Sequence, residues 1–320
     1  MNWQTEITAA AGRIASHIRR TPVIGADMPG AGGPESGWPE SGWPESGWVE
    51  FKLEHMQHAG SFKTRGAFNS LLGATVPKAG VVAASGGNHG AAVAYAARSL
   101  GHPARIYVPE FAGPAKIGLI RAQGADLHIV PGNYANALAL AQAYSAETGA
   151  MQIHAFDAPA TVAGQGTVML EWEDQGLAAD TVLLAVGGGG LIGGAMAWLN
   201  GRRKVVAVEP VLAPTLNRAL RDGPDTKVEV GGIAANALGA SQIGRICFDL
   251  ATAQGIQSVL VTDAAIAEAQ ALLWRSLRQW VEPAGAAALA ALTSGAYRPA
   301  KGETVAVLIC GANPAPDPFG

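Results

Sequence analysis

The sequence predicts an α/β protein built from two doubly wound domains with mostly parallel sheets. Short apolar runs rich in valine and isoleucine alternate with longer stretches of helical periodicity, as in parallel sheets covered by helices. Three of the apolar runs lead directly into unusual turns, at residues 85–89, 187–190 and 310–313. Ligands of doubly wound sheets bind beyond the carboxyl ends of the strands, so these turns predict one shared site.

The expected elements follow from the hydrophobic patterns. The apolar runs predict strands at residues 48–53, 80–84, 104–108, 126–130, 181–186, 204–209 and 304–310. The stretches between them predict helices at residues 90–100, 115–123, 134–147, 191–200 and 264–280. The first 20 residues predict an amphipathic helix, with acidic residues early and basic residues late.

Residues 34–48 consist of three copies of Pro-Glu-Ser-Gly-Trp. A five-residue period fits neither a helix nor a strand, and proline and glycine interrupt both. We expect a low-complexity surface loop. Alternatively, the three tryptophans form an adhesive patch or a partner site.

The composition excludes several classes of function. The 320 residues carry a formal net charge of −3 without a cluster of Lys or Arg, which argues against nucleic-acid binding. No apolar run approaches the roughly 20 residues of a membrane span, and the N-terminus does not resemble a signal peptide. The two cysteines, Cys247 and Cys310, provide neither a disulfide framework nor a thiolate metal cage. We expect a cytoplasmic protein.

The glycine-rich turn has two functional interpretations. Four successive glycines followed by a helix allow backbone N–H groups to surround a phosphate: Gly187, Gly188, Gly189 and Gly190. The spacing of Gly188, Gly190 and Gly193 also matches the dinucleotide fingerprint, with Glu209 about 20 residues on as the ribose-binding acid. A tight strand-to-helix turn is the purely structural alternative.

Lys63 is the candidate nucleophile. It follows Gly60-Ser61-Phe62 at an expected helix start, with Ser61 as the N-cap. The positive potential of a helix N-terminus should lower the pKa of a lysine and favour its uncharged amine. A single lysine is usually a solvated surface charge, so this interpretation depends on the neighbouring motifs.

Together these motifs resemble the fold-type II pyridoxal-phosphate enzymes, the serine/threonine dehydratase family. The stretch Gly60-Ser61-Phe62-Lys63-x-Arg65-Gly66-Ala67 resembles the family's Schiff-base motif. The other turns resemble its substrate-carboxylate loop, its phosphate loop and its pyridine-nitrogen segment. The residues 235–239 and Cys310 are closest in pattern to liver-type serine dehydratase. The resemblance covers nearly the whole chain, with the motifs in the expected order.

The resemblance implies a role for each motif residue. Lys63 would carry pyridoxal 5'-phosphate as a Schiff base, Phe62 would pack on one face of its ring, and Cys310 would face the pyridine nitrogen. Asn88 would bind the ring hydroxyl, and 187–190 would hold the phosphate, which the family mechanism uses to protonate the leaving hydroxide. The substrate carboxylate would be bound by the loop of Ser85, Gly86, Gly87, Asn88 and His89. Whether His89 is catalytic or merely packed stays open.

The resemblance also implies a domain arrangement and a cation. Residues 1–58 and 159–320 would form a large cofactor-binding domain, and residues 59–158 a small domain with Lys63 and the substrate loop. Glu209, the carbonyls of Ala213 and Leu238, and Thr215 are candidate ligands of a monovalent cation such as potassium. A structural glutamate at the end of a strand is the alternative. We expect a homodimer.

The implied reaction is dehydration and deamination of L-serine, L-threonine or both, yielding pyruvate or 2-oxobutanoate plus ammonia. Another β-elimination, a β-substitution or a racemisation on the same cofactor is the main alternative. Gly86 stands where racemase-like relatives carry a serine base, which disfavours racemisation. A dinucleotide oxidoreductase and a non-catalytic amino-acid sensor are less favoured, because neither needs Lys63. Glu282 is expected near the site, and the sequence assigns it no role.

Overall fold

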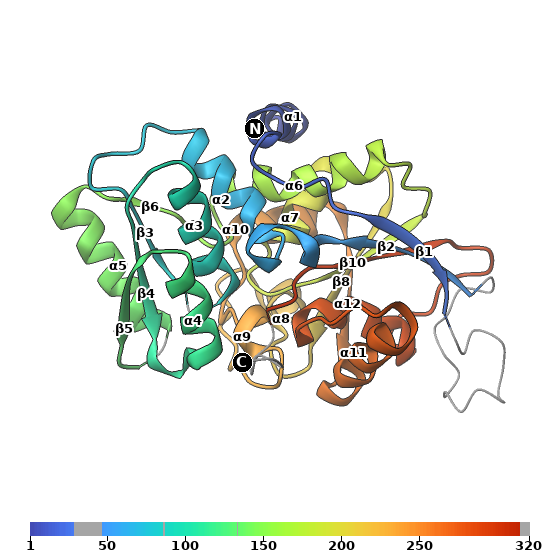
Figure 1. Ribbon diagram of the computed structural model, residues 1–320. Helices are drawn as coiled ribbons and strands as arrows, with labels where there is room; N and C mark the ends of the chain where they lie inside the picture. Colours follow the sequence, from blue (N-terminus) through green and yellow to red (C-terminus); the bar gives the residue numbers. More distant parts are fainter. Residues whose placement is uncertain (29–46, 86, 133, 314–320) are drawn as a thin grey trace.

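The computed structural model describes residues 1–28, 47–85, 87–132 and 134–313 and shows an α/β protein with two sheets (Figure 1). The predicted fold class is confirmed. Most of the repeat at residues 34–48 lies outside the described residues, as does Gly86. Within the described ranges, no helix combines the length and apolar character needed to cross a membrane.

The larger sheet has six strands in the order β1-β2-β10-β7-β8-β9. Only β1 and β2 pair in antiparallel fashion, and every other neighbouring pair is parallel. The strands are β1 (Val23–Asp27), β2 (Trp48–Leu53), β10 (Val305–Ile309), β7 (Thr181–Ala185), β8 (Lys204–Pro210) and β9 (Gln257–Val261). Strands β7 and β10 are buried along their whole length, as expected for central strands covered on both faces.

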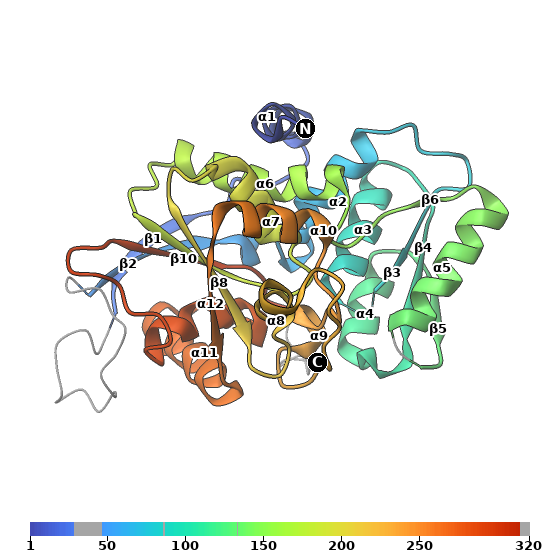
Figure 2. The same cartoon turned by 180° about the vertical axis from the view of Figure 1, so that it is seen from behind.

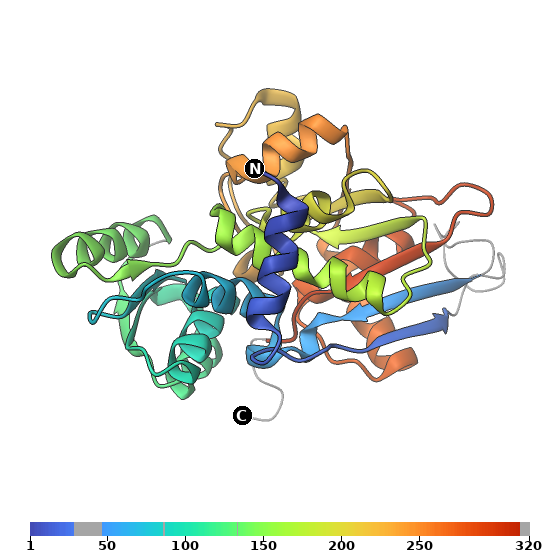
Figure 3. The same ribbon diagram turned by 90° about the horizontal axis from the view of Figure 1, so that it is seen from above.

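Helices cover both faces of this sheet (Figures 1 and 2). One face carries α6 (Pro159–Asp174), α7 (Gly190–Leu199) and α10 (Arg245–Gln254); the other carries α11 (Asp263–Leu277) and α12 (Pro283–Thr293). Helix α1 (Trp3–Ile14) lies across α6, as Figure 3 shows from above. Two short helices, α8 (Thr215–Asp222) and α9 (Ala235–Leu238), follow β8.

The smaller sheet is fully parallel, in the order β5-β4-β3-β6. Its strands are β3 (Val81–Ala84), β4 (Ala104–Pro109), β5 (Asp126–Val130) and β6 (Met151–Gln152). Successive side chains of a strand point to opposite faces. Accordingly, Val81 and Ala83 pack in the cluster with α2 (Lys63–Leu72) and α3 (Asn88–Ser99), whereas Val82 and Ala84 pack in the cluster with α5 (Tyr134–Thr148). Helix α4 (Pro114–Ala122) follows β4.

The predicted domains and their boundaries stay a prediction. All four strands of the smaller sheet fall within residues 59–158. Three strands were missing from the sequence prediction: β1, the two-residue β6, and β9. The predicted helix 264–280 ends three residues too late, because Arg278 adopts a left-handed conformation (φ 55°) and α11 ends at Leu277.

Candidate active site

Residues of three predicted motifs line one cavity between the two sheets, whereas the segment 310–313 does not line it. Its volume is about 750 Å³, and it lies where β3 and β7 end. Predicted site residues that line it are Lys63, Ser85, Gly87, Asn88, His89 and Gly188. Its remaining wall is largely apolar, with Leu138, Phe156, Val228 and Val230 among its members. Side chains beyond the carboxyl ends of two strands, one from each sheet, thus line the same cavity.

Lys63 is the first residue of α2, and its amine faces the cavity. Nζ donates a hydrogen bond to the carbonyl of Ala155 at 2.8 Å and lies 5.2 Å from the centre of the Phe62 ring. Burial lowers the pKa of Lys63 to about 8. The predicted N-cap was wrong: Phe62 takes that place, and the buried Ser61 hydroxyl has no hydrogen-bond partner among the described residues. An amine with this pKa is partly uncharged near neutral pH.

Asn88 is held by two side chains from the C-terminal part of the chain, one at the start of α12 and one after β10. Its Nδ2 donates to Glu282 Oε1, and its Oδ1 accepts from Asn313 Nδ2 at 2.8 Å. Glu282 is buried at the start of α12, where burial raises its pKa. Its counter-charge is the buried Lys116 of α4, with Nζ 3.6 Å from Oε2. These contacts fix the amide orientation and leave one Nδ2 hydrogen available for a ligand.

Two histidines lie beside Lys63. The ring of His89 is buried, and its Nε2 bonds to the carbonyl of Ile153 at 3.0 Å. Burial, followed by the charge of Lys63, lowers the pKa of His89 to about 3, so the ring is neutral. His154, in the loop after β6, lines the same cavity. Because a carbonyl oxygen only accepts hydrogen bonds, Nε2 of His89 must carry the ring proton and donate it to Ile153. His89 therefore has no N–H group left for a ligand.

The glycine loop packs too closely against other segments of the chain to carry side chains. A Cβ at Gly187 would lie 2.8 Å from Leu238 Cα, and one at Gly188 would lie 2.2 Å from the Phe156 ring. Gly189 has φ +91° and caps α7, which begins at Gly190. Close backbone approach at a helix N-terminus suits a phosphate group. The loop and the amine of Lys63 therefore fit a phosphorylated aldehyde cofactor.

Cys310 directly follows β10 and contacts the residue before Lys63. Its carbonyl accepts the N–H of Phe62 at 3.1 Å, and its Sγ donates to the carbonyl of Ala284 at 3.3 Å. Burial raises the pKa of the Cys310 thiol well above its usual range. The neutral thiol has only weak acceptor capacity left for a ring nitrogen, and its predicted position facing that nitrogen stays a prediction.

Glu209 is fully buried at the end of β8. Its carboxylate accepts the N–H groups of Leu216 and Asn217 at 2.6 and 2.7 Å and the Ser258 hydroxyl at 3.1 Å. Burial raises its pKa to about 7. The Thr215 hydroxyl donates to the carbonyl of Ala240 at 2.8 Å. In the described part of the chain, no three His, Cys, Asp or Glu side chains gather as a metal group. The monovalent-cation site stays a prediction.

Several residues at the site were not identified from the sequence. Lys116 lies in the first turn of α4, and His154 lies in an irregular loop, and neither belongs to a recognised motif. Asn313 was part of a recognised motif, but its contact with Asn88 depends on two segments 225 residues apart.

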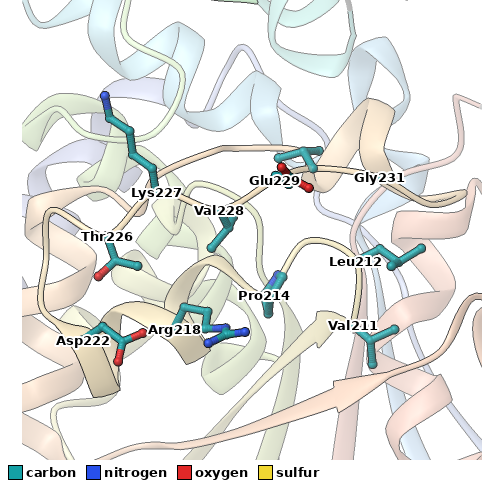
Figure 4. Close-up of a pocket in the computed structure, with 11 residues that line it drawn as sticks. Val211, Leu212, Pro214, Arg218, Asp222, Thr226, Lys227, Val228, Glu229 and Gly231 are labelled. Carbon is teal, nitrogen blue, oxygen red and sulfur yellow. The ribbon is translucent and has the colours of Figure 1, made fainter.

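A second hollow of about 520 Å³ lies outside the cavity wall (Figure 4). Residues from α8 and from the segment 226–231 surround it, including Arg218 and Asp222. Val228 and Val230 border both spaces. The segment 226–231 is therefore a thin wall of the candidate active site.

Comparison with known proteins identifies the family. Residues 16–311 match the model described as "Pyridoxal-phosphate dependent enzyme". The chain belongs to this family. Its cofactor is therefore pyridoxal 5'-phosphate, and the dinucleotide interpretation of the glycine loop is wrong.

Similar proteins of this family act on hydroxy-amino acids. Phenylserine dehydratase of Ralstonia pickettii is 36% identical over 83% of this chain and 82% of its own length. The threonine deaminase of T.th. has a TM-score of 0.84 and 34% identity, covering 98% of this chain and 99% of that one. Maize serine racemase has a TM-score of 0.85 and 30% identity, covering 97% and 93%. The similarity to the fold-type II enzymes predicted from the motifs is confirmed.

Proposed function

We propose that this enzyme dehydrates and deaminates L-serine, L-threonine or both, releasing pyruvate or 2-oxobutanoate and ammonia. The observation that carries the proposal is the amine of Lys63, whose pKa is about 8, in a cavity shared with Asn88 and the glycine loop. The similarity to threonine deaminase and phenylserine dehydratase supports elimination from a β-hydroxy-amino acid.

Each residue has a defined task in this proposal. Pyridoxal phosphate, when bound, supplies an electron sink for the bond pair released at Cα. Lys63 holds the cofactor and, once the substrate amine has replaced it, takes the Cα proton. The backbone around Ser85 and Gly87, at the start of α3, binds the substrate carboxylate. The proton taken from Cα and the hydroxide lost from Cβ add up to one water. The enamine that is released takes up a proton at Cβ, and hydrolysis of the resulting imine gives the keto acid and ammonia.

A keto-acid assay tests this proposal. The purified enzyme, loaded with cofactor, should form keto acid from L-serine or L-threonine, and phenylserine is included because of the relative that is named for it. Release of ammonia in equal amount is expected. Turnover of neither L-serine nor L-threonine would refute the proposed reaction.

Racemisation is the second candidate, since maize serine racemase has the same fold. Gly86 provides no side chain to act as a second base on the opposite face of the substrate. We therefore expect negligible D-serine after partial turnover of L-serine. Chiral chromatography of the recovered serine measures it, and abundant D-serine would favour the racemase.

We also propose that the enzyme is a homodimer. Light scattering of the holoenzyme tests this.

A further inference from the structure

His154 has a ring orientation that leaves one donor for the cavity. It lies between β6 and α6, and it lines the space that contains Lys63 and Asn88. Its Nδ1 accepts backbone N–H groups from Phe156 at 3.3 Å and from Asp157 at 2.9 Å. An imidazole nitrogen that accepts N–H bonds carries no proton, so the neutral ring is protonated at Nε2.

The ring is held in this state by its surroundings. The pKa of His154 is lowered, mainly because the ring is buried. The nearby Asp157 raises this pKa and the positive charge of Lys63 lowers it, and the net shift is downward. The ring of Phe156 meets it edge-to-face, with centroids 4.9 Å apart. Phe156 in turn packs against Gly188 of the glycine loop. His154 is thus a fixed neutral imidazole.

The neighbouring His89 differs in the use of its proton. Its Nε2–H donates to the carbonyl of Ile153, whereas Nε2 of His154 has no protein partner among the described residues. Of the two rings beside Lys63, only His154 therefore offers a free N–H group. A neutral imidazole N–H can polarise a substrate oxygen without giving up its proton.

We propose that His154 is a catalytic residue that donates a hydrogen bond from Nε2 to the β-hydroxyl of the bound hydroxy-amino acid. This proposal rests on the proposed elimination and adds a residue that orients the leaving oxygen and stabilises the negative charge building on it. His154 neither gains nor loses a proton in this role. The donor selects substrates with an oxygen on Cβ.

Two substitutions separate the two ring nitrogens. His154→Asn places an amide oxygen near the position of Nδ1, so it keeps the acceptor for Phe156 and Asp157 and removes the distal donor. His154→Gln places an amide N–H near the position of Nε2 and removes the loop acceptor. His128→Asn, at a half-exposed histidine of β5, is the control.

The expected result depends on the leaving group. His154→Asn should lower kcat for L-serine about tenfold or more, because the transition state loses one good hydrogen bond. It should change kcat for β-chloro-L-alanine by less than about twofold, because chloride accepts hydrogen bonds weakly and leaves without a proton. His154→Gln should retain more serine activity than His154→Asn. Circular dichroism and the visible cofactor absorbance should match the wild type.

Several outcomes would overturn the proposal. An equal loss with both substrates would show a structural role for the loop, and full serine activity of His154→Asn would show no role. If His154→Asn does not fold, nitrogen NMR of ¹⁵N-histidine-labelled wild-type enzyme decides, since it must show His154 protonated at Nε2 and not at Nδ1. If the wild type eliminates from neither substrate, the proposed function itself fails, and the NMR result still tests the tautomer.

Discussion

Nζ of Lys63 donates a hydrogen bond to the backbone carbonyl of Ala155, 92 residues further along the chain. This contact holds the amine at the first turn of α2, against the loop that also carries His154 and Phe156. A carbonyl partner adds no negative charge, so burial dominates and the pKa falls to about 8. The lysine is prepared for nucleophilic attack before a cofactor arrives.

Cofactor capture should therefore have a distinctive pH dependence. Below pH 8 the Lys63 amine is protonated and cannot attack an aldehyde, and above it the amine is free. We expect the rate of pyridoxal phosphate capture by the apoprotein to rise with a midpoint near pH 8, followed by stopped-flow absorbance. Lys63→Ala should neither develop the Schiff-base absorbance nor turn over substrate, whereas Lys301→Ala, at an exposed lysine, should behave as wild type. A midpoint near 10.5 would contradict this account.

The buried pair of Lys116 and Glu282 predicts a pH-dependent stability change. Lys116→Met leaves Glu282 buried without its counter-charge, which costs about 3–5 kcal/mol when the carboxylate is ionised. Because Lys116 lowers the pKa of Glu282, its removal raises that pKa further above the ordinary 4.5. A carboxyl with a raised folded pKa loses stability as pH rises above the unfolded value. The variant should therefore be more destabilised at pH 8 than at pH 5.

Urea unfolding at the two pH values measures this effect. The double variant Lys116→Met/Glu282→Gln should recover part of the loss, because no buried charge remains. Equal destabilisation at both pH values would argue that Lys116 acts by packing alone.

The single variant Glu282→Gln keeps an amide oxygen that can accept the hydrogen bond from Asn88. Its activity should therefore fall less than that of Glu282→Ala.

Four charges form a buried network that anchors the helix of Lys63. Arg65, two residues after Lys63, bonds Glu54 and Glu171, and Lys52 bonds Glu171 at 2.6 Å. Arg65→Met leaves two carboxylates with one lysine, so we expect a loss of about 3–5 kcal/mol in the free energy of unfolding. Arg245→Met, which breaks an exposed pair with Asp249, should cost less than about 1 kcal/mol. Urea titrations of the holoenzymes compare the two, and similar losses would contradict a special role of the network.

Much of the fold could be predicted because most of the strands can be recognised from short runs of apolar residues. The bounds predicted for β2 and β5 agree with the structure. The turns after β3 and β7 line one cavity although the two strands belong to different sheets, because each turn follows the carboxyl end of a strand, where ligands of such sheets bind. β9 was missed because its mixed sequence, Gln-Ser-Val-Leu-Val, is not a continuous apolar run. β1 contains a glycine and forms the antiparallel edge.

Other features depend on contacts that a sequence does not display. The role of Ser61 as N-cap was wrong because the backbone of residue 61 pairs with Gly311, which moves the start of α2 to Lys63. Lys116 reaches Glu282 only because α4 of the smaller sheet meets the start of α12. The tautomer of His154 likewise depends on a turn in its own loop.

The predicted cation site has a direct test. Activity after dialysis into a buffer free of monovalent metal ions should fall and return with potassium but not with magnesium. Glu209→Gln should abolish this response, because an amide attracts a cation less than a carboxylate does. The control is Glu173→Gln, at a glutamate that pairs with Arg202. Full activity in the metal-free buffer, or its loss on adding a divalent chelator in the presence of potassium, would exclude the site.

The last prediction concerns Gly187, whose missing side chain brings the loop against α9. A Cβ there would lie 2.8 Å from Leu238 Cα and 3.0 Å from its carbonyl oxygen, and backbone atoms cannot rotate away. Gly187→Ala must therefore displace either the phosphate loop or the segment that contains Leu238. We expect the Kd for pyridoxal phosphate to rise about tenfold or more, since N–H groups aimed at an anion lose energy when they are displaced. Gly118→Ala, at a helical glycine with open space around its Cβ position, should leave that Kd unchanged. Fluorescence titration of the two apoproteins measures both constants, and an unchanged Kd for Gly187→Ala would show that the loop does not hold the phosphate.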